Sequence, residues 1–237
     1  MDTQTKVAYT CNILSMEGHT DTIYGHVSAR VENAEQIWMK PATLGLEEVR
    51  PHDMLTLDLD GEKLAGVLPR HVEFPIHTEV YRQRPEVQCV IHTHPLYATA
   101  FSAVAEPLRP VNHEEALFAP TLPRFTYTSD LIVTPALGQA VAAALGASRA
   151  LLLKNHGIVV VGTSVEEACV TAILLEKAAH MQLLARQYGA IEWTPDTEAL
   201  QKQARIYHPE AFQHIFPPHF GERRILSESY WNSHSLM

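Results

Sequence analysis

The sequence predicts an α/β protein, a three-layer α/β/α sandwich around a mixed and largely antiparallel central sheet. Short β-branched runs alternate along the chain with longer segments of helical periodicity, which is typical of a sheet covered by helices. Tight turns join the early runs, and strands joined in this way pair antiparallel. Because no linker-like stretch divides the chain, we expect a single domain over residues 1–237.

The first part of the chain carries most of the antiparallel signals. A helix is predicted over residues 5–17, since Gly18 follows it and glycine is common just after a helix end. Strands are then predicted at residues 27–31, 36–39 and 54–58. Asp60-Gly61 is a typical hairpin turn after the last of these strands.

The second part alternates helices with strongly apolar strands. Helices are predicted at residues 74–84, 136–145 and 164–188. Thr134 and Ser164 are suitable N-cap residues for the last two. An apolar strand that begins near Val87 ends at Pro95, and a short helix should follow. Residues 151–161 are predicted as one further strand, interrupted in its middle by polar residues.

Residues 194–237 form a C-terminal tail with weak periodicity. Its aromatic content argues against disorder, because these side chains need apolar surroundings: Tyr207, Phe212, Phe216, Phe220, Tyr230 and Trp231. The tail is therefore expected to pack on the body or on a neighbouring subunit.

The composition favours a small-molecule partner in a reducing compartment. The net charge is -9, and the basic residues are scattered among acids, so no nucleic-acid partner is expected. No stretch approaches the roughly 20 apolar residues that span a bilayer, so no membrane partner is expected either. The three cysteines lack metal-site or disulfide spacing, which suits a cytoplasmic protein.

His92 and His94 are the most informative residues of the chain. They stand one residue apart near the end of an apolar strand, so both side chains project from one face and can converge on one cation. His156 is the strongest candidate for a third ligand, because a polar residue within an apolar strand requires a reason. Gly157 beside it permits a bulge or a close backbone approach. Ordinary core or surface histidines are the alternative.

Glu73 and His77 lie at the start of a predicted helix upstream of this strand. The Glu73 carboxylate would be a fourth ligand or a general acid/base, and a carboxylate that merely stabilises the helix N-terminus is the alternative. His77 follows four residues later on the same helical face. It would position Glu73 or line the pocket, although a packing role is equally compatible with the spacing.

The order of these residues resembles the class II aldolase/adducin family. Glu73 and His77 are followed by His92-Thr93-His94-Pro95 and then by Asn155-His156-Gly157, and the resemblance covers roughly residues 5–190. It implies a metal-dependent lyase, usually a cyclic homotetramer with active sites between subunits. His92, His94 and His156 would hold the metal, with Glu73 as the catalytic acid/base. Adducin-like members without enzymatic activity typically lack this ligand set, which the present chain retains.

Several residues depart from the sugar-phosphate aldolases of this family. The early turn contains His26 and Ser28, Arg70 and His71 precede the glutamate, and the small serines that admit a phosphate are absent. Bulky and potentially cationic side chains suit a planar carboxylate better, since Arg binds a carboxylate through two hydrogen bonds. Solvent-facing loop residues are the alternative for Arg70 and His71. His113, which follows a strand-like segment, is a further candidate for contacting substrate.

Within the family, these residues look most like the branch that decarboxylates hydroxylated aromatic acids, such as the dihydroxyphthalate decarboxylases. We therefore expect loss of carbon dioxide from a phthalate-type acid through a metal-stabilised enolate. The alternatives are a class II aldolase or epimerase acting on a sugar or small hydroxy-carbonyl compound, and a noncatalytic interaction module. One divalent ion per subunit is expected, Mn²⁺ or Zn²⁺, although Co²⁺ and Fe²⁺ suit the same ligands.

Overall fold

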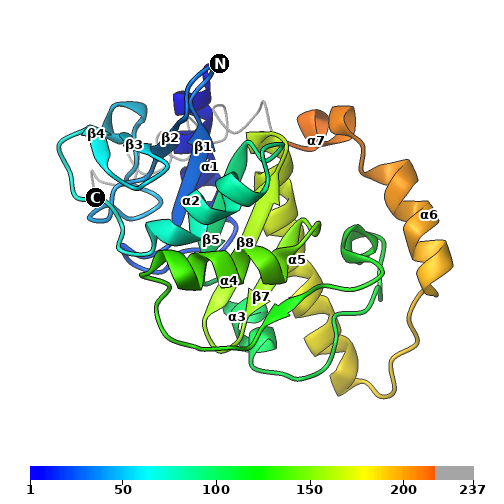
Figure 1. Ribbon diagram of the computed structural model, residues 1–237. Helices are drawn as coiled ribbons and strands as arrows, with labels where there is room; N and C mark the ends of the chain where they lie inside the picture. The colour runs from blue at the N-terminus through cyan, green and yellow to red at the C-terminus, as the bar shows by residue number, and fades with distance from the viewer. Residues whose placement is uncertain (217–237) are drawn as a thin grey trace, which may run out of the picture.

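An eight-stranded sheet runs through the middle of the protein in the order β4-β3-β2-β1-β5-β8-β7-β6 (Figure 1). The computed structural model describes residues 1–216. The strands are His26–Arg30 (β1), Gln36–Met39 (β2), Leu55–Asp58 (β3), Lys63–Ala65 (β4), Cys89–Thr93 (β5), Arg124–Phe125 (β6), Ala150–Leu153 (β7) and Gly157–Gly162 (β8). Among the strands of residues 1–216, β6 and β7 pair in parallel and every other neighbouring pair is antiparallel. The prediction of a mixed and largely antiparallel sheet is confirmed.

Helices cover both faces of this sheet (Figure 1). Helices α2 (Phe74–Gln83) and α4 (Pro135–Leu145) pack together on one face, while α1 (Thr3–Met16), α3 (Leu96–Ser102) and α5 (Val165–Gln187) lie on the other. Two short 3₁₀ helices complete this part, Pro51–Asp53 (η1) and Glu114–Phe118 (η2). Successive strand residues alternate between the two apolar layers: Val90 joins the α2/α4 layer and Ile91 the layer of α1 and α5. The predicted three-layer sandwich is confirmed.

The prediction of one interrupted strand over residues 151–161 is wrong. The chain reverses there, because β7 and β8 pair antiparallel and residues 154–156 form the turn between them. Asn155 adopts a positive φ of 55°, a conformation that asparagine tolerates better than most residues. The polar residues that interrupt the apolar run are therefore the turn of a hairpin.

Helix α5 is the longest helix and forms part of the core. Its N-cap is Ser164, as predicted, whose side chain accepts a hydrogen bond from the Glu167 backbone. The helix is long and apolar enough to cross a membrane, but 56% of its apolar window is buried inside the protein. It packs against α1, α3 and β8, which is how a core helix is placed.

Two helices of the C-terminal segment pack on the body. They are α6 (Asp196–Ile206) and α7 (Pro209–Ile215). The Gln203 side-chain amide in α6 donates to backbone carbonyls of residues 116, 117 and 119 around η2, and Tyr207 and Phe212 join a hydrophobic cluster of the core. Phe220, Tyr230 and Trp231 lie outside the described residues.

Gly138 sets the close contact between α2 and α4. A Cβ atom at this position would lie 2.5 Å from the backbone oxygen of Pro75 and 2.8 Å from Cγ of Glu79. We expect Gly138→Ala to lower the free energy of unfolding by about 1–3 kcal/mol through overpacking, measured by urea denaturation.

Ala143→Gly, on the exposed side of the same helix, is the matched control. It changes only helix propensity and should cost about 1 kcal/mol. A Gly138→Ala protein as stable as the wild type would contradict the close helix contact.

Candidate metal centre

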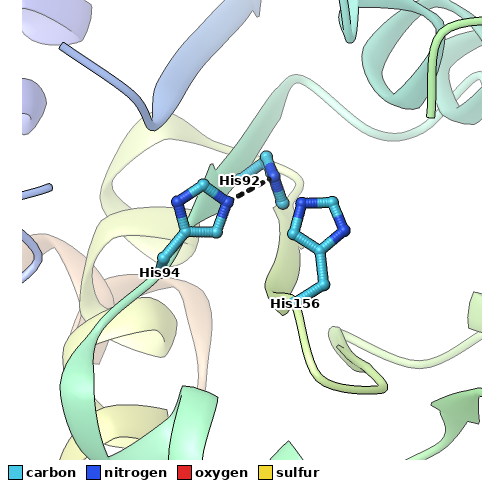
Figure 2. A group of neighbouring side chains, drawn as sticks. All are labelled: His92, His94 and His156. Atoms are coloured by element: carbon cyan, nitrogen blue, oxygen red, sulfur yellow. Dashed lines mark hydrogen bonds between the residues drawn. The ribbon is translucent and has the colours of Figure 1, made fainter. Parts of the chain in front are cut away.

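Three histidines converge where β5 ends and β8 begins (Figure 2). His92 belongs to β5, His94 follows its last residue, and His156 occupies the turn before β8. One ring nitrogen from each lies within 4.8 Å of the other two. The Nε2 atoms of His92 and His94 are 3.0 Å apart. The structure thus brings together all three histidines that the sequence predicts as metal ligands.

The outer nitrogens of the β5 pair are occupied. Nδ1 of His92 lies 2.9 Å from the carbonyl oxygen of Ile158, and Nδ1 of His94 lies 2.7 Å from a carboxylate oxygen of Asp21. If each Nδ1 carries the proton, both Nε2 lone pairs face each other, which is unfavourable unless a cation lies between them. Tetrahedral Zn²⁺ with bonds of about 2.0–2.1 Å would separate two such nitrogens by roughly 3.3 Å. The donor set therefore fits a divalent metal ion.

Gly157 makes room for this arrangement. A Cβ atom there would stand 2.5 Å from the backbone oxygen of Thr93 and 2.6 Å from Cδ2 of His94. Only a residue without a side chain lets the β8 hairpin approach the end of β5 this closely. The structure confirms that glycine at position 157 permits a close backbone approach between β8 and the end of β5.

Glu73 supplies a carboxylate beside the histidines. It is the N-cap residue of α2 and is buried, with its two oxygens 3.7 Å from Nε2 of His92 and 3.7 Å from Nε2 of His156. The backbone N–H of Ile132 donates to Oε1. Burial alone would raise the pKa of Glu73, but the His92 contact and this hydrogen bond outweigh it and lower the pKa to about 2. The side chain is therefore a carboxylate at neutral pH.

His26, Ser28 and His77 form a buried group next to the metal-site histidines. The β1/β5 register places His26 directly opposite His92, with ring centroids 5.0 Å apart. Nδ1 of His26 lies 2.6 Å from Nε2 of His77, and Nδ1 of His77 lies 2.6 Å from the Ser28 hydroxyl. His77 is fully buried and therefore contacts His26, with no surface exposed to solvent. Ser28, predicted to bind substrate, likewise lies behind His26 and is fully buried.

His71 and Arg70 lie on the other side of His26. The His71 ring centroid is 4.4 Å from that of His26, and its Nε2 is 3.2 Å from the buried ammonium group of Lys40. The Arg70 guanidinium stacks over the Phe74 ring at 3.9 Å. Both Arg70 and His71 line an open cavity of about 740 Å³ whose other walls are mainly apolar.

His113 lies apart from this cluster. It is exposed and precedes η2, which packs on α5 and α6. Within residues 1–216, no hydrogen bond or ring contact joins it to the other histidines. Its substrate contact stays a prediction.

Four residues that support the site were not identified from the sequence. The Asp21 carboxylate hydrogen-bonds to Nδ1 of His94, and the Lys40 ammonium group hydrogen-bonds to Nε2 of His71. The Tyr81 hydroxyl contacts the Ser28 hydroxyl at 2.9 Å. His19 is fully buried with Nδ1 2.9 Å from the Thr93 hydroxyl. A lysine directly after an apolar strand was the one signal available for Lys40, whereas the others come from loops or helices without any distinguishing pattern.

Residues 5–183 match the family described as Class II Aldolase and Adducin N-terminal domain. The chain belongs to this family. The structure of L-fuculose 1-phosphate aldolase from Glaciozyma antarctica superimposes with a TM-score of 0.84 at 26% identity, covering 96% of this chain and 90% of that one. The expected family and fold are both confirmed.

Two relatives are named as decarboxylases. Decarboxylase NovR from Streptomyces niveus is 35% identical over 69% of this chain, and 3,4-dihydroxyphthalate decarboxylase from Arthrobacter keyseri is 30% identical over 81% of it. The match covers 82% of the dihydroxyphthalate enzyme but 62% of NovR, and the chain spans less than two thirds of the length of several curated relatives that it matches.

Removing the charge behind His94 should weaken metal binding. Asp21→Asn keeps the side-chain shape but loses the carboxylate that orients the ring and raises its basicity. We expect about 10–100-fold weaker Zn²⁺ affinity, measured by competition with a chromophoric chelator.

Glu35→Gln, on the exposed turn between β1 and β2, removes the same charge at a distance and should leave the affinity unchanged. Equal affinities for Asp21→Asn and the wild type would exclude this role for Asp21.

Proposed function

We propose that the protein is a divalent-metal-dependent lyase that decarboxylates a hydroxylated aromatic carboxylic acid of the phthalate type. The observation that carries this proposal is the pairing of His26 with His71 beside a large cavity. Arg70 and His71 precede Glu73, where the sugar-phosphate aldolases of the family carry small hydroxyl residues, and Arg70 offers a guanidinium for a carboxylate.

The cavity walls favour an aromatic substrate. Val72, Phe74, Leu131 and Val133 supply apolar surface to it, and Val72 and Leu131 are at least half exposed in the single chain. An aromatic ring would cover this surface while the carboxylate that the product retains contacts Arg70. The similarity to 3,4-dihydroxyphthalate decarboxylase supports the same substrate class, and the similarity to Decarboxylase NovR supports decarboxylation.

A divalent cation held by His92, His94 and His156 supplies Lewis-acid chemistry, because it stabilises negative charge on a neighbouring oxygen. The carboxylate of Glu73 takes the proton of the substrate hydroxyl group. It then delivers this proton to the ring carbon that bears the leaving carboxylate. When the carbon–carbon bond breaks, carbon dioxide leaves and the electron pair returns to the ring and its oxygen.

The proposal also covers the metal ion, the cellular compartment and the oligomeric state of the protein. We propose Mn²⁺ as the bound ion, with Zn²⁺ as the second choice; the three imidazole ligands accept either ion, so ligand type does not select between them. We place the protein in the cytoplasm as a homotetramer whose active sites lie between subunits. The three cysteines are free and buried, as a reducing compartment allows.

The reaction class is tested by following two products. Protein loaded with Mn²⁺ or Zn²⁺ is incubated with 3,4-dihydroxyphthalate while carbon dioxide is measured, and with L-fuculose 1-phosphate while aldehyde is measured. We expect carbon dioxide from the aromatic acid. Aldehyde release without any carbon dioxide would overturn the proposal in favour of an aldolase.

His92→Ala should abolish turnover, because it removes a ring that contacts both His94 and Glu73. We expect at least a 1,000-fold loss of kcat, on the order of a metal centre's contribution to such reactions. His52→Ala, which changes an exposed histidine of η1, should leave kcat unchanged. Full activity in His92→Ala would exclude metal ligation by this residue.

A further inference from the structure

His26 and His71 each have one ring nitrogen occupied and one free. Within residues 1–216, Nδ1 of His26 contacts His77 and Nε2 of His71 contacts Lys40 and the Pro41 carbonyl, while the opposite nitrogens have no partner. Neither of these opposite nitrogens is among the fully buried side-chain atoms of residues 1–216 that lack a hydrogen-bond partner, so each retains some exposed surface. Nε2 of His26 and Nδ1 of His71 are therefore the ring nitrogens left for a ligand, although both side chains are largely buried.

The proton position on His26 depends on a chain of three buried groups behind it. His26 contacts His77 at 2.6 Å, His77 contacts Ser28 at 2.6 Å, and Ser28 contacts the Tyr81 hydroxyl at 2.9 Å. Each contact needs one donor and one acceptor, so the direction of one hydrogen bond fixes all the others. Either every donor points toward His26 or every donor points toward Tyr81.

Tyr81 decides between these two directions. Its side chain is 1% exposed, and within residues 1–216 the Ser28 hydroxyl is the only side-chain hydrogen-bond partner of the Tyr81 hydroxyl. If Ser28 donated to it, the Tyr81 hydrogen would be buried without an acceptor, at a cost of about 1–3 kcal/mol. Tyr81 therefore donates to Ser28, Ser28 to His77, and Nε2 of His77 to Nδ1 of His26. His26 must then carry its own hydrogen on Nε2.

Lys40 sets the proton position on His71. Its ammonium group is fully buried and has three hydrogens, and it lies 3.0 Å from the carbonyls of Ile23 and Pro41 and 3.2 Å from Nε2 of His71. Three donors meet three acceptors only if Nε2 of His71 carries no hydrogen. Burial lowers the pKa of Lys40 to about 8, so the ammonium form prevails at neutral pH. The hydrogen of His71 is then on Nδ1.

We infer that Nε2–H of His26 and Nδ1–H of His71 form a two-donor site that binds the carboxylate of the substrate. Four residues that do not contact substrate act as positioning residues by fixing these two tautomers: Ser28, Lys40, His77 and Tyr81. The ring centroids of His26 and His71 are 4.4 Å apart, which suits two donors to a single carboxylate. The assignment to a carboxylate rests on the proposed function, whereas the two tautomers do not.

Uncharged donors suit a carboxylate that must leave as carbon dioxide. Nδ1 of His26 accepts from His77 and Nε2 of His71 accepts from Lys40, so each ring carries a single hydrogen and neither ring is a cation. Decarboxylation moves negative charge away from this carboxylate. A cation at the same place would stabilise the reactant more than the transition state, whereas neutral N–H groups orient the carboxylate at a smaller cost.

The tautomers can be read directly by long-range ¹H–¹⁵N correlation spectra of Zn²⁺-loaded protein with ¹⁵N-labelled histidine. His26→Gln and His71→Gln assign the two signals. We expect His26 protonated on Nε2 and His71 on Nδ1 in the wild type. The opposite tautomer at either ring would overturn the inference for that donor.

Two variants address the positioning residues separately. In Tyr81→Phe the Ser28 hydrogen still has Nδ1 of His77 as its acceptor, so His26 should keep the Nε2–H form and His71 should be unchanged. An Nδ1–H signal at His26 in this variant would contradict the hydrogen count. Lys40→Met should shift His71 to the Nε2–H form, which donates to the Pro41 carbonyl 3.1 Å away, while His26 is unchanged. Each variant controls for the other, and a change at both rings in both variants would indicate a structural effect only.

Carboxylate binding is tested with two non-reacting probes in calorimetric titrations of the Zn²⁺ protein. Phthalate has carboxylates without a hydroxyl group, and catechol has hydroxyl groups without a carboxylate. Lys40→Met should weaken phthalate binding by about tenfold or more, the value of a hydrogen bond to a charged group, and leave catechol binding within about twofold. Equal losses for both probes would overturn the two-donor site. If neither probe binds the wild type but the tautomers are as stated, the proposed substrate class fails and the tautomers stand.

Discussion

The antiparallel pairing of β1, β5 and β8 is the constraint on which the rest of the site depends. Its register places His26 opposite His92 and brings the turn that carries His156 beside the end of β5. Gly157 allows the backbones to approach closely enough for the histidine rings to meet. Because all three strands are buried between helix layers, this register cannot slip by one residue without turning the apolar side chains to the wrong layer. The position of the metal site is therefore fixed by the same packing that forms the core.

Around this centre, the polar groups are arranged in pairs, with one histidine facing the site and one hydrogen-bonding group behind it. Asp21 lies behind His94, the Ile158 carbonyl behind His92, His77 behind His26 and Lys40 behind His71. A buried imidazole needs a partner for its inner nitrogen, and that partner determines which nitrogen faces outward as a donor or as a lone pair. The same physical requirement would give lone pairs at the three histidines proposed to bind the metal and N–H donors at His26 and His71.

The three converging histidines and the residues next to them, His26, His71 and Arg70, have different parts in the proposed reaction. The chain has the same fold as an L-fuculose 1-phosphate aldolase, and its sequence is similar to those of two decarboxylases. The metal ligands and Glu73 serve any reaction in which charge develops on an oxygen beside the broken bond. Under our proposal, the reaction is selected by the residues next to the three histidines, which here are His26, His71 and Arg70, and the last two line an apolar cavity.

The sequence alone determined the layers of the fold, most element positions and the three converging histidines, because these depend on local periodicity and on the two-residue repeat of a strand. It did not determine the reversal at residues 154–156, since an apolar run looks alike whether it is one strand or two strands joined by a turn. Nor did it assign His77 and Ser28 to a position behind His26, or identify Asp21, Lys40 and Tyr81. These roles depend on hydrogen bonds between segments 31 to 73 residues apart, and only the tertiary structure brings those partners into contact.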